Sequence, residues 1–469
     1  MSNVTISITH TKASPNIKLK SEIWYFLIIA FPLAAAYLAE YAMFVTTKIV
    51  VGKLGYEALA AVGIAGGLSF EILVILMGFL SVIGVLAAQA NGAGDRLGLG
   101  QTVRQGFIVS TFLGIPTMLL IWNLDLVLEA TGQDPVVIRL ATPYLQGLSS
   151  MALPVLWFAV FRNFISALSK PAAIMVISIA AVFLNYVLTV WLVYGGLGLP
   201  AMGLFGAGLA TTIVTWLMFF SLAIYIYRHT ELRGYGLFHG RWHFNRTITS
   251  EIIRLGIPVA GLTLMEAGMF IAVSILSGVI GIKTLAAYEI VMSWVGIPFV
   301  LAFGLAEATM IRVAQAVGKG QILDARRAGN LAMVFGVGLL SILVIVPLGF
   351  SDQIIRLFIS PSDVGFEEVS ILAAQFLVIA AIFQVFDGLQ AIAARALRAF
   401  KDMIAPLWIA GFGYWVLGIG GGSMLAFHFD LQGAGLWWGL TMGLMTTSTL
   451  LCMRFNNLTR NKIGKFQPT

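Results

Sequence analysis

Long apolar runs alternate with short polar breaks along almost the whole chain. Twelve of these runs are long enough to cross the roughly 30 Å hydrocarbon core of a bilayer as helices. The predicted spans are residues 22–48, 56–88, 101–124, 136–160, 165–194, 203–227, 250–279, 284–315, 327–350, 367–397, 404–428 and 433–453. A segment in lipid must satisfy its backbone hydrogen bonds internally. The pattern therefore predicts an all-α membrane protein with twelve transmembrane helices.

The polar segments divide the chain into five parts. Residues 1–21 form a polar N-terminal tail, and residues 454–469 form a short basic C-terminal tail. The longest internal polar break, 228–249, separates the sixth span from the seventh. We expect it to be a linker between an N-terminal bundle, 22–227, and a C-terminal bundle, 250–453, of six helices each.

Basic residues gather on one side of this arrangement. The 28 Lys and Arg divide into 23 on one side, where we count Arg162 and Arg395, and five on the other. The five are Lys48, Lys53, Arg139, Lys283 and Arg356. Because cytoplasmic loops of membrane proteins are enriched in Lys and Arg, both tails and the linker are predicted to be cytoplasmic.

The two predicted bundles are related in sequence. At a constant offset of 226, residues 32–94 and 258–320 agree at 20 of 63 positions without a gap. The matched positions include a proline, Pro32 with Pro258, and a glutamate, Glu40 with Glu266. Six spans per half start both halves on the same side, so the repeats are parallel, about an axis along the membrane normal. We expect a central cleft where the two bundles meet.

Composition excludes several classes of protein. The chain is 59% hydrophobic and 10% charged, whereas a soluble domain carries nearer 25% charge. A net charge of +7 is spread over alternate loops, so no nucleic acid partner is expected. The single cysteine, Cys452, excludes a disulfide within the chain. The sequence contains none of the GxSxG, HExxH or GxxxxGK[ST] motifs, which argues against an enzyme and against nucleotide-driven pumping.

Two acids within the predicted spans are the leading candidates for chemistry. Glu266 lies about 22 Å from Glu251 at the helical rise of about 1.5 Å per residue, and Asp387 lies about 15 Å from Leu397. No basic residue is expected in the middle of a span, and Arg395 is expected to reach the headgroups. Carboxylates in lipid are costly as bare charges, so these two should hold a proton or a metal cation. The alternative is a structural hydrogen bond between helices.

The matched prolines lie eight residues before the matched glutamates. A proline removes a backbone donor and can bend a helix, so Pro32 and Pro258 are candidate hinges. The alternative is that they only shape packing.

Four motifs together resemble those of the multidrug and toxic compound extrusion (MATE) transporters, NorM-like branch. They are LGIP at 255–258, MEAGMF at 265–270, AQAVGKG at 314–320 and FDGLQAIAARALRAFKDM at 386–403. The resemblance implies an inner-membrane antiporter that exports organic, usually cationic and amphipathic compounds in exchange for Na⁺ or H⁺. It also implies that Glu266 and Asp387 are the cation-linked acids of the C-terminal half.

The N-terminal half departs from that family pattern. Where relatives carry an aspartate five residues before the glycine that ends the first span, this chain has Thr47. Asn185 matches a family asparagine, but the acid expected one turn later is Thr189. We hypothesise that Glu40, two turns from Thr47 on the same helix, replaces the missing acid.

The resulting expectation is a monomeric drug or metabolite antiporter with no cofactor besides its coupling ion, Na⁺ or H⁺. Glu266 and Asp387 would bind that ion, and Met269, Phe270 and Phe383 would supply an adaptable apolar wall for a small organic substrate. Two alternatives remain open. One is a flippase or exporter of the same fold, for a lipid-linked sugar, an anionic metabolite or a siderophore. The other is a passive channel or scaffold.

Overall fold

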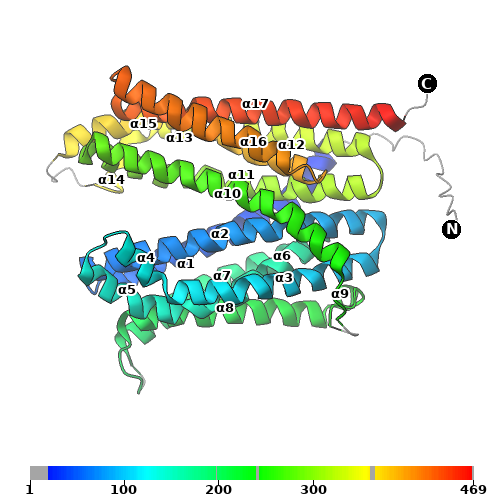
Figure 1. Ribbon diagram of the computed structural model, residues 1–469, viewed down its shortest axis with the longest axis horizontal. Coiled ribbons are helices and arrows are strands. Elements are labelled where there is room, and N and C mark those ends of the chain that lie inside the picture. Colours follow the sequence, from blue (N-terminus) through cyan, green and yellow to red (C-terminus); the bar gives the residue numbers. More distant parts are fainter. Residues whose placement is uncertain (1–18, 197, 239–241, 360–364, 467–469) are drawn as a thin grey trace.

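The computed structural model describes residues 19–196, 198–238, 242–359 and 365–466, and in these ranges the chain is almost entirely helical (Figure 1). The helices are α1 (Leu19–Gly52), α2 (Tyr56–Ala93), α3 (Arg96–Trp122), α4 (Leu124–Ala130), α5 (Pro135–Leu148), α6 (Ala152–Ala167), α7 (Ala172–Tyr194), α8 (Gly203–Arg228), α9 (Thr230–Arg233), α10 (Arg246–Ile280), α11 (Ile282–Gly318), α12 (Ile322–Leu343), α13 (Ile345–Gly349), α14 (Ser351–Arg356), α15 (Phe366–Arg398), α16 (Ile404–Gly411) and α17 (Gln432–Phe466), with a 3-10 turn η1 (Ser149–Met151) and π-helices η2 (Phe412–Gly421) and η3 (Met424–His428). Residues 1–18 of the predicted N-terminal tail and 467–469 of the predicted C-terminal tail lie outside the described residues. Helix α17 continues through 454–466 of the C-terminal tail.

Every predicted span is occupied by helix. By length and composition, 11 helical segments within the described residues could cross a membrane. The fourth combines α5, η1 and α6, and the last combines α16, η2 and η3. The twelfth predicted span falls on α17, a 35-residue helix that is not among the 11. The prediction of an all-α membrane protein is confirmed.

Polar residues in the breaks between spans begin several helices. Asp95 accepts a hydrogen bond from the backbone N–H of Gly98 at the start of α3. Asp134 does the same for Val136 at the start of α5, and Asn245 caps α10. Such caps satisfy backbone donors that a helix leaves free at its N-terminus.

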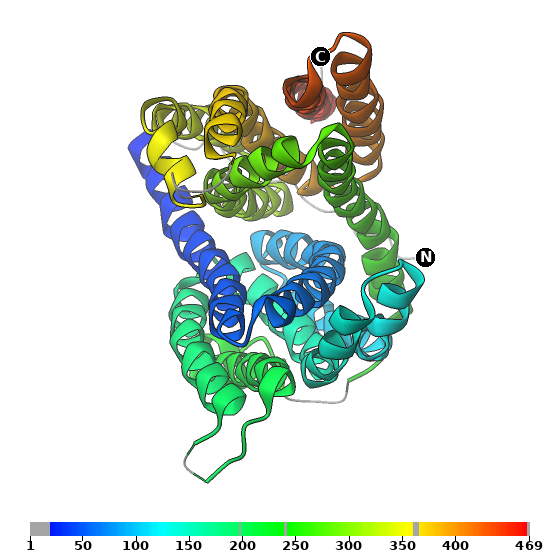
Figure 2. The ribbon, with the colours of Figure 1, turned by 90° about the vertical axis from the view of Figure 1, so that its left-hand side faces the viewer.

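Two groups of helices lie side by side, one from each half of the chain. Figure 2 shows them end-on, with α11 to α17 above, α2 to α8 below, and α1 and α10 running between the two groups. Two long helices join the groups reciprocally. Helix α1 packs on α7 of its own half and on α11 of the other, and its counterpart α10 packs on α2.

The two halves meet through contacts that obey the sequence repeat. The Gln89 side chain donates to the carbonyl of Ala399 at 2.8 Å, and its counterpart Gln315 donates to the carbonyl of Ala167 at 2.8 Å. A Cβ added at Gly92 would overlap the Gln315 carbonyl oxygen, and one added at Gly318 would overlap that of Gln89. These contacts lie at the ends of α2, α6, α11 and α15, so the halves are closed against each other there.

Replacing Gly92 with Ala is expected to destabilise the protein by about 2 kcal/mol, because the added methyl cannot fit against backbone. Gly63, on the same helix, is the matched control, since a Cβ there would have no neighbour within 4 Å. Gly63→Ala should leave stability unchanged or raise it slightly, as Ala favours helix. Thermal melting of the purified variants measures both. Equal melting temperatures would contradict this reading of the interface.

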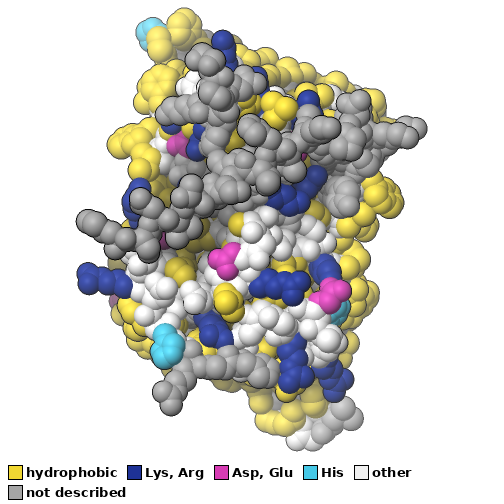
Figure 3. Space-filling model, turned by 90° about the vertical axis from the view of Figure 1, so that its right-hand side faces the viewer, with side chains coloured by type: hydrophobic (Ala, Val, Ile, Leu, Met, Phe, Trp, Pro, Cys, Tyr) yellow, Lys and Arg dark blue, Asp and Glu magenta, His cyan; other side chains and the backbone are white. Residues whose placement is uncertain are grey.

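Basic side chains gather on the closed end of the molecule. Helix α1 begins and α17 ends at the right of Figure 1, and Figure 3 shows Lys and Arg spread over the described part of that end. Apolar side chains cover the flanks instead, with large exposed examples such as Phe112, Phe183 and Trp408. Exposed apolar flanks and a basic end are the surfaces that a lipid bilayer requires.

Candidate functional site

The two acids singled out in the sequence come together inside the C-terminal half. Asp387 lies on α15 and is 2% exposed, and its Oδ1 has no hydrogen-bond partner among the described residues. Glu266 lies on α10, close enough to Asp387 for the two charges to act on each other. Glu71 of α2, in the other half, also lies within electrostatic range of Glu266. The structure thus holds an under-compensated pair of carboxylates within the membrane layer.

The prediction about basic residues near these acids is wrong. Arg395 does not reach the membrane surface: its Nε donates to the Glu307 carboxylate at 2.8 Å, and its side chain is 10% exposed. Arg398 is also buried and donates to the Ser81 hydroxyl at 2.8 Å, across the interface between the halves. Both arginine charges act on Glu266, so Asp387 is the less compensated of the two acids.

Sequence reasoning missed two neighbours of this pair. Tyr414 is fully buried on the π-helix η2, and the Gln390 side chain donates to its hydroxyl. The charges of Glu266 and Asp387 both act on Tyr414. Glycines occupy six of the positions 411–422 around it, and π-helical turns frequently mark functional sites. The glycine-rich stretch was the only available signal.

The proposed apolar wall is packed tightly in this conformation. Phe383 is fully buried between Phe270 and Trp437, with ring centroids 6.2 Å and 5.6 Å away. Met269 is also fully buried and faces η2 near Gly418. Only Phe270 keeps partial exposure. These side chains stiffen the surroundings of the acids rather than line an open space here.

In the N-terminal half, Thr47, Asn185 and Thr189, at or near the positions where this chain departs from the family pattern, lie close together. The Asn185 amide on α7 donates to the Thr47 hydroxyl on α1 at 3.0 Å. Thr189 is fully buried one turn further along α7, and its hydroxyl, like Asn185 Oδ1, has no partner among the described residues. This buried polar cluster carries no charge.

Glu40 is paired with an arginine that the sequence analysis assigned to the basic side. Arg162 of α6 donates to both Glu40 carboxylate oxygens, at 3.0 and 3.1 Å, and its side chain is 7% exposed. Its guanidinium also approaches Met77 Sδ at 3.4 Å. The predicted spans 136–160 and 165–194 placed Arg162 in the break between them, but it lies on α6 and its side chain faces α1. The expectation that Arg162 lies in the polar break between two spans is therefore wrong.

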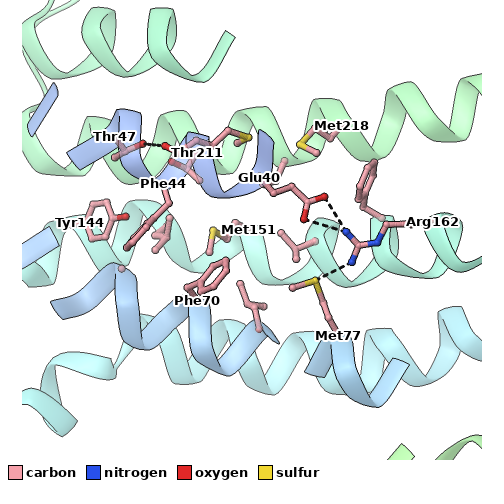
Figure 4. Close-up of a pocket in the computed structure, with 17 residues that line it drawn as sticks. Glu40, Phe44, Thr47, Phe70, Met77, Tyr144, Met151, Arg162, Thr211 and Met218 are labelled. Atoms are coloured by element: carbon pink, nitrogen blue, oxygen red, sulfur yellow. Dashed lines mark hydrogen bonds and ion pairs between the residues drawn. The ribbon is translucent and has the colours of Figure 1, made fainter. Parts of the chain in front are cut away.

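The Glu40–Arg162 pair closes one end of a cavity of about 110 Å³ in the N-terminal half (Figure 4). Thr47 and Tyr144 lie toward the other end. Apart from Thr211 and Thr215, the rest of the wall is apolar, and it is rich in methionine. Its methionines are Met43, Met77, Met151 and Met218, and its phenylalanines are Phe44, Phe70 and Phe158. Flexible thioethers and aromatic rings suit ligands of varied shape.

Comparisons with known proteins agree with this architecture. The family model described as MatE matches two segments, residues 32–191 and 258–423. The chain belongs to the MatE family. The two matches begin at Pro32 and Pro258, the same pair of positions with which the sequence repeat begins.

Individual relatives are similar over nearly their whole length. The chain is 35% identical over 447 residues to the "Probable multidrug resistance protein NorM" of Mesorhizobium japonicum, covering 95% of each chain. It is 35% identical over 441 residues to the protein of the same name from Pseudomonas aeruginosa, covering 94% of this chain and 90% of that one. The eukaryotic MATE transporter AtDTX14 superposes with a TM-score of 0.83 at 23% identity, covering 96% of this chain and 100% of that chain.

Membership in the MatE family confirms the predicted resemblance. The protein is a multi-pass membrane transporter and not an enzyme. An outward-facing structure of a multidrug resistance MATE family transporter superposes with a TM-score of 0.84, at 19% identity, covering 96% of this chain and 99% of that one. This likeness shows a shared fold.

Proposed function

We propose that this MatE-family transporter is a secondary antiporter of the cell inner membrane. It exports organic, cationic and amphipathic compounds, drugs among them, in exchange for Na⁺ or H⁺. The observation that carries the proposal is the pair Glu266 and Asp387, two acids in proximity with a buried carboxylate oxygen that has no partner among the described residues. Keeping such charges within a membrane is expensive unless they bind something.

Coupling in this proposal arises from differential binding. The ion and the substrate each favour a different state of the two bundles, and each state exposes the sites to one side of the membrane. The bundles 22–227 and 250–453 move against each other, with both tails and the linker 228–249 in the cytoplasm. Pro32 and Pro258 interrupt the backbone bonding of α1 and α10, the helices that join the halves, and serve as hinges. A monomer suffices for this cycle.

The substrate class is supported by the N-terminal cavity and by the relatives. The relatives carry the name multidrug resistance protein, and a methionine- and phenylalanine-lined cavity suits amphipathic molecules of varied shape. An exporter of anions or of lipid-linked sugars would be favoured by a free cation in the cavity. Arg162 is a cation at that place, but Glu40 already neutralises it. The Glu40 charge is consequently not available as a simple replacement for the missing acid at Thr47.

The test is substrate-evoked ion movement in proteoliposomes, with ethidium as a cationic probe and fluorescent reporters of internal pH and Na⁺. Adding ethidium should drive H⁺ or Na⁺ in the opposite direction, and the reporter that responds identifies the ion. Uptake of ethidium with no response to either gradient would overturn antiport and favour a channel.

Glu266→Gln is expected to lower this coupled flux at least tenfold, because it removes one of the two charges that attract the ion. Glu289→Gln is the matched control. Glu289 is exposed and accepts a hydrogen bond from Ser274 at 3.0 Å, away from the paired acids. Glu289→Gln should keep most of the flux. Equal flux in the two variants would exclude Glu266 from the ion site.

A further inference from the structure

Six side chains form one continuous ladder across the interface between the halves. In order, they are Glu40, Arg162, Tyr37, Phe303, Arg395 and Glu307. We name this set the arginine–aromatic ladder. Its order is symmetric: an acid, an arginine and an aromatic ring in the N-terminal half, then a ring, an arginine and an acid in the C-terminal half.

Each step of the ladder is a close contact. The Arg162 guanidinium carbon lies 4.7 Å from the Tyr37 ring centroid, and that of Arg395 lies 3.8 Å from the Phe303 centroid. The Tyr37 and Phe303 rings meet edge to face, with centroids 4.9 Å apart and planes at 85°. A cation over a ring face and an edge-to-face ring pair are both favourable geometries. The two arginines are thereby held in register across the interface.

The N-terminal end of the ladder lines the cavity, and its C-terminal end lies within electrostatic range of the acid pair. Glu40 and Arg162 line the N-terminal cavity. Arg395 lies two turns along α15 from Asp387, about 12 Å at the helical rise, and its charge acts on Glu266. A change of charge at either site therefore alters the electrostatic environment of one arginine of the ladder.

The ladder can separate at the contact between Tyr37 and Phe303 without the loss of either ion pair. If the halves separate between Tyr37 and Phe303, Arg162 keeps Glu40 and Arg395 keeps Glu307. No charge of the ladder is then left without its ion-pair partner within the membrane, where an unpaired ion would be costly. Both rings are already partly exposed, whereas both arginines are buried.

We propose that Tyr37 and Phe303 are positioning residues of the transport cycle. Their contact is a latch that holds the two halves together about midway along α1 and α11, and it opens between the rings in each turnover. The proposal rests on the alternating access proposed above. It assigns the two rings a role in the balance between conformations, without contact to the ion or the substrate.

The latch can be tested by distance measurement without any substrate or gradient. Cys452 is the only cysteine, so Cys452→Ser with Leu97→Cys and Gln321→Cys places two spin labels at the basic end, one in each half. Electron paramagnetic resonance in liposomes then reports the separation of the halves. In this background, Tyr37→Leu and Phe303→Leu should each raise the ratio of open to closed populations by roughly fivefold, the factor for a lost aromatic pair.

Three further variants test whether the effect comes from the contact between the two rings. Tyr37→Phe keeps the ring and should retain the closed distance. The double variant Tyr37→Leu/Phe303→Leu should match a single one, because either change removes the same contact. Phe107→Leu removes a comparable edge-to-face contact with Phe161, at 4.6 Å, inside the N-terminal half, and should not change the distance.

An unchanged distance in both single Leu variants, additive effects in the double variant, or an equal response to Phe107→Leu would each overturn the latch. None of these results bears on antiport itself. Conversely, if the unmodified protein shows no substrate-evoked ion flux, the proposed antiport is wrong. The spin-label distances would still test the latch in that case.

Discussion

Replacing Asp387 with Asn is expected to abolish uphill export, with initial rates of ion-coupled transport falling about 100-fold or more. Asp387 is the less compensated acid of the pair, because the arginine charges act on Glu266. Asparagine keeps the size of the side chain and removes the negative charge. Without that charge the ion gains little by binding, and a ligand without differential affinity cannot shift a conformational equilibrium.

The substitution should not harm folding. Asp387 Oδ1 has no hydrogen-bond partner among the described residues, so an amide there breaks no bond of that oxygen. Removing a buried charge that has no ion-pair partner is, if anything, stabilising. Melting temperature measured beside transport separates loss of function from loss of structure.

The control is Asp352→Asn, the same chemical change on an exposed residue of the short helix α14. Its export rate should equal that of the unmodified protein. Asp387→Asn protein that still pumps against a gradient would show that the coupling ion binds elsewhere. The buried polar cluster of Thr47, Asn185 and Thr189 would then be the next place to look.

How much of this site could be predicted depends on what linear sequence encodes. The repeat predicted that Glu266 and Glu40 occupy equivalent positions and that the two halves are parallel. Matched residues at a fixed offset reflect matched positions in space. The reciprocal contacts of Gln89 and Gln315 show that relation directly. Helical rise likewise placed Asp387 at a depth similar to that of Glu266.

Depth along a helix does not reveal which neighbour a side chain faces. Arg162 was assigned to the basic side because it falls in the break between two predicted spans, but its partner comes from α1, 122 residues earlier. Arg395 was similarly expected at the headgroups, and Glu307, 88 residues earlier, holds it inside. Tyr414 was missed for another reason: a π-helix departs from the 3.6-residue period on which pattern reading rests.

Replacing Arg162 with Met is expected to cause the largest loss of stability, about 3 kcal/mol. The change removes one partner of a mostly buried ion pair and leaves the Glu40 carboxylate, 23% exposed, without its cation. It also removes the cation from the face of Tyr37. Thermal melting of the purified variant, compared with unmodified protein, measures the effect.

An exposed ion pair supplies the matched control. Lys170 donates to Glu231, which lowers the pKa of that carboxyl, but the two side chains are 40% and 70% exposed. Lys170→Met should therefore leave the melting temperature nearly unchanged, since water solvates either partner alone. The double variant Arg162→Met/Glu40→Gln should recover most of the lost stability, because no unpaired charge remains. If Arg162→Met melts like Lys170→Met, the buried pair contributes little, and the Glu40 charge would be free to act in transport after all.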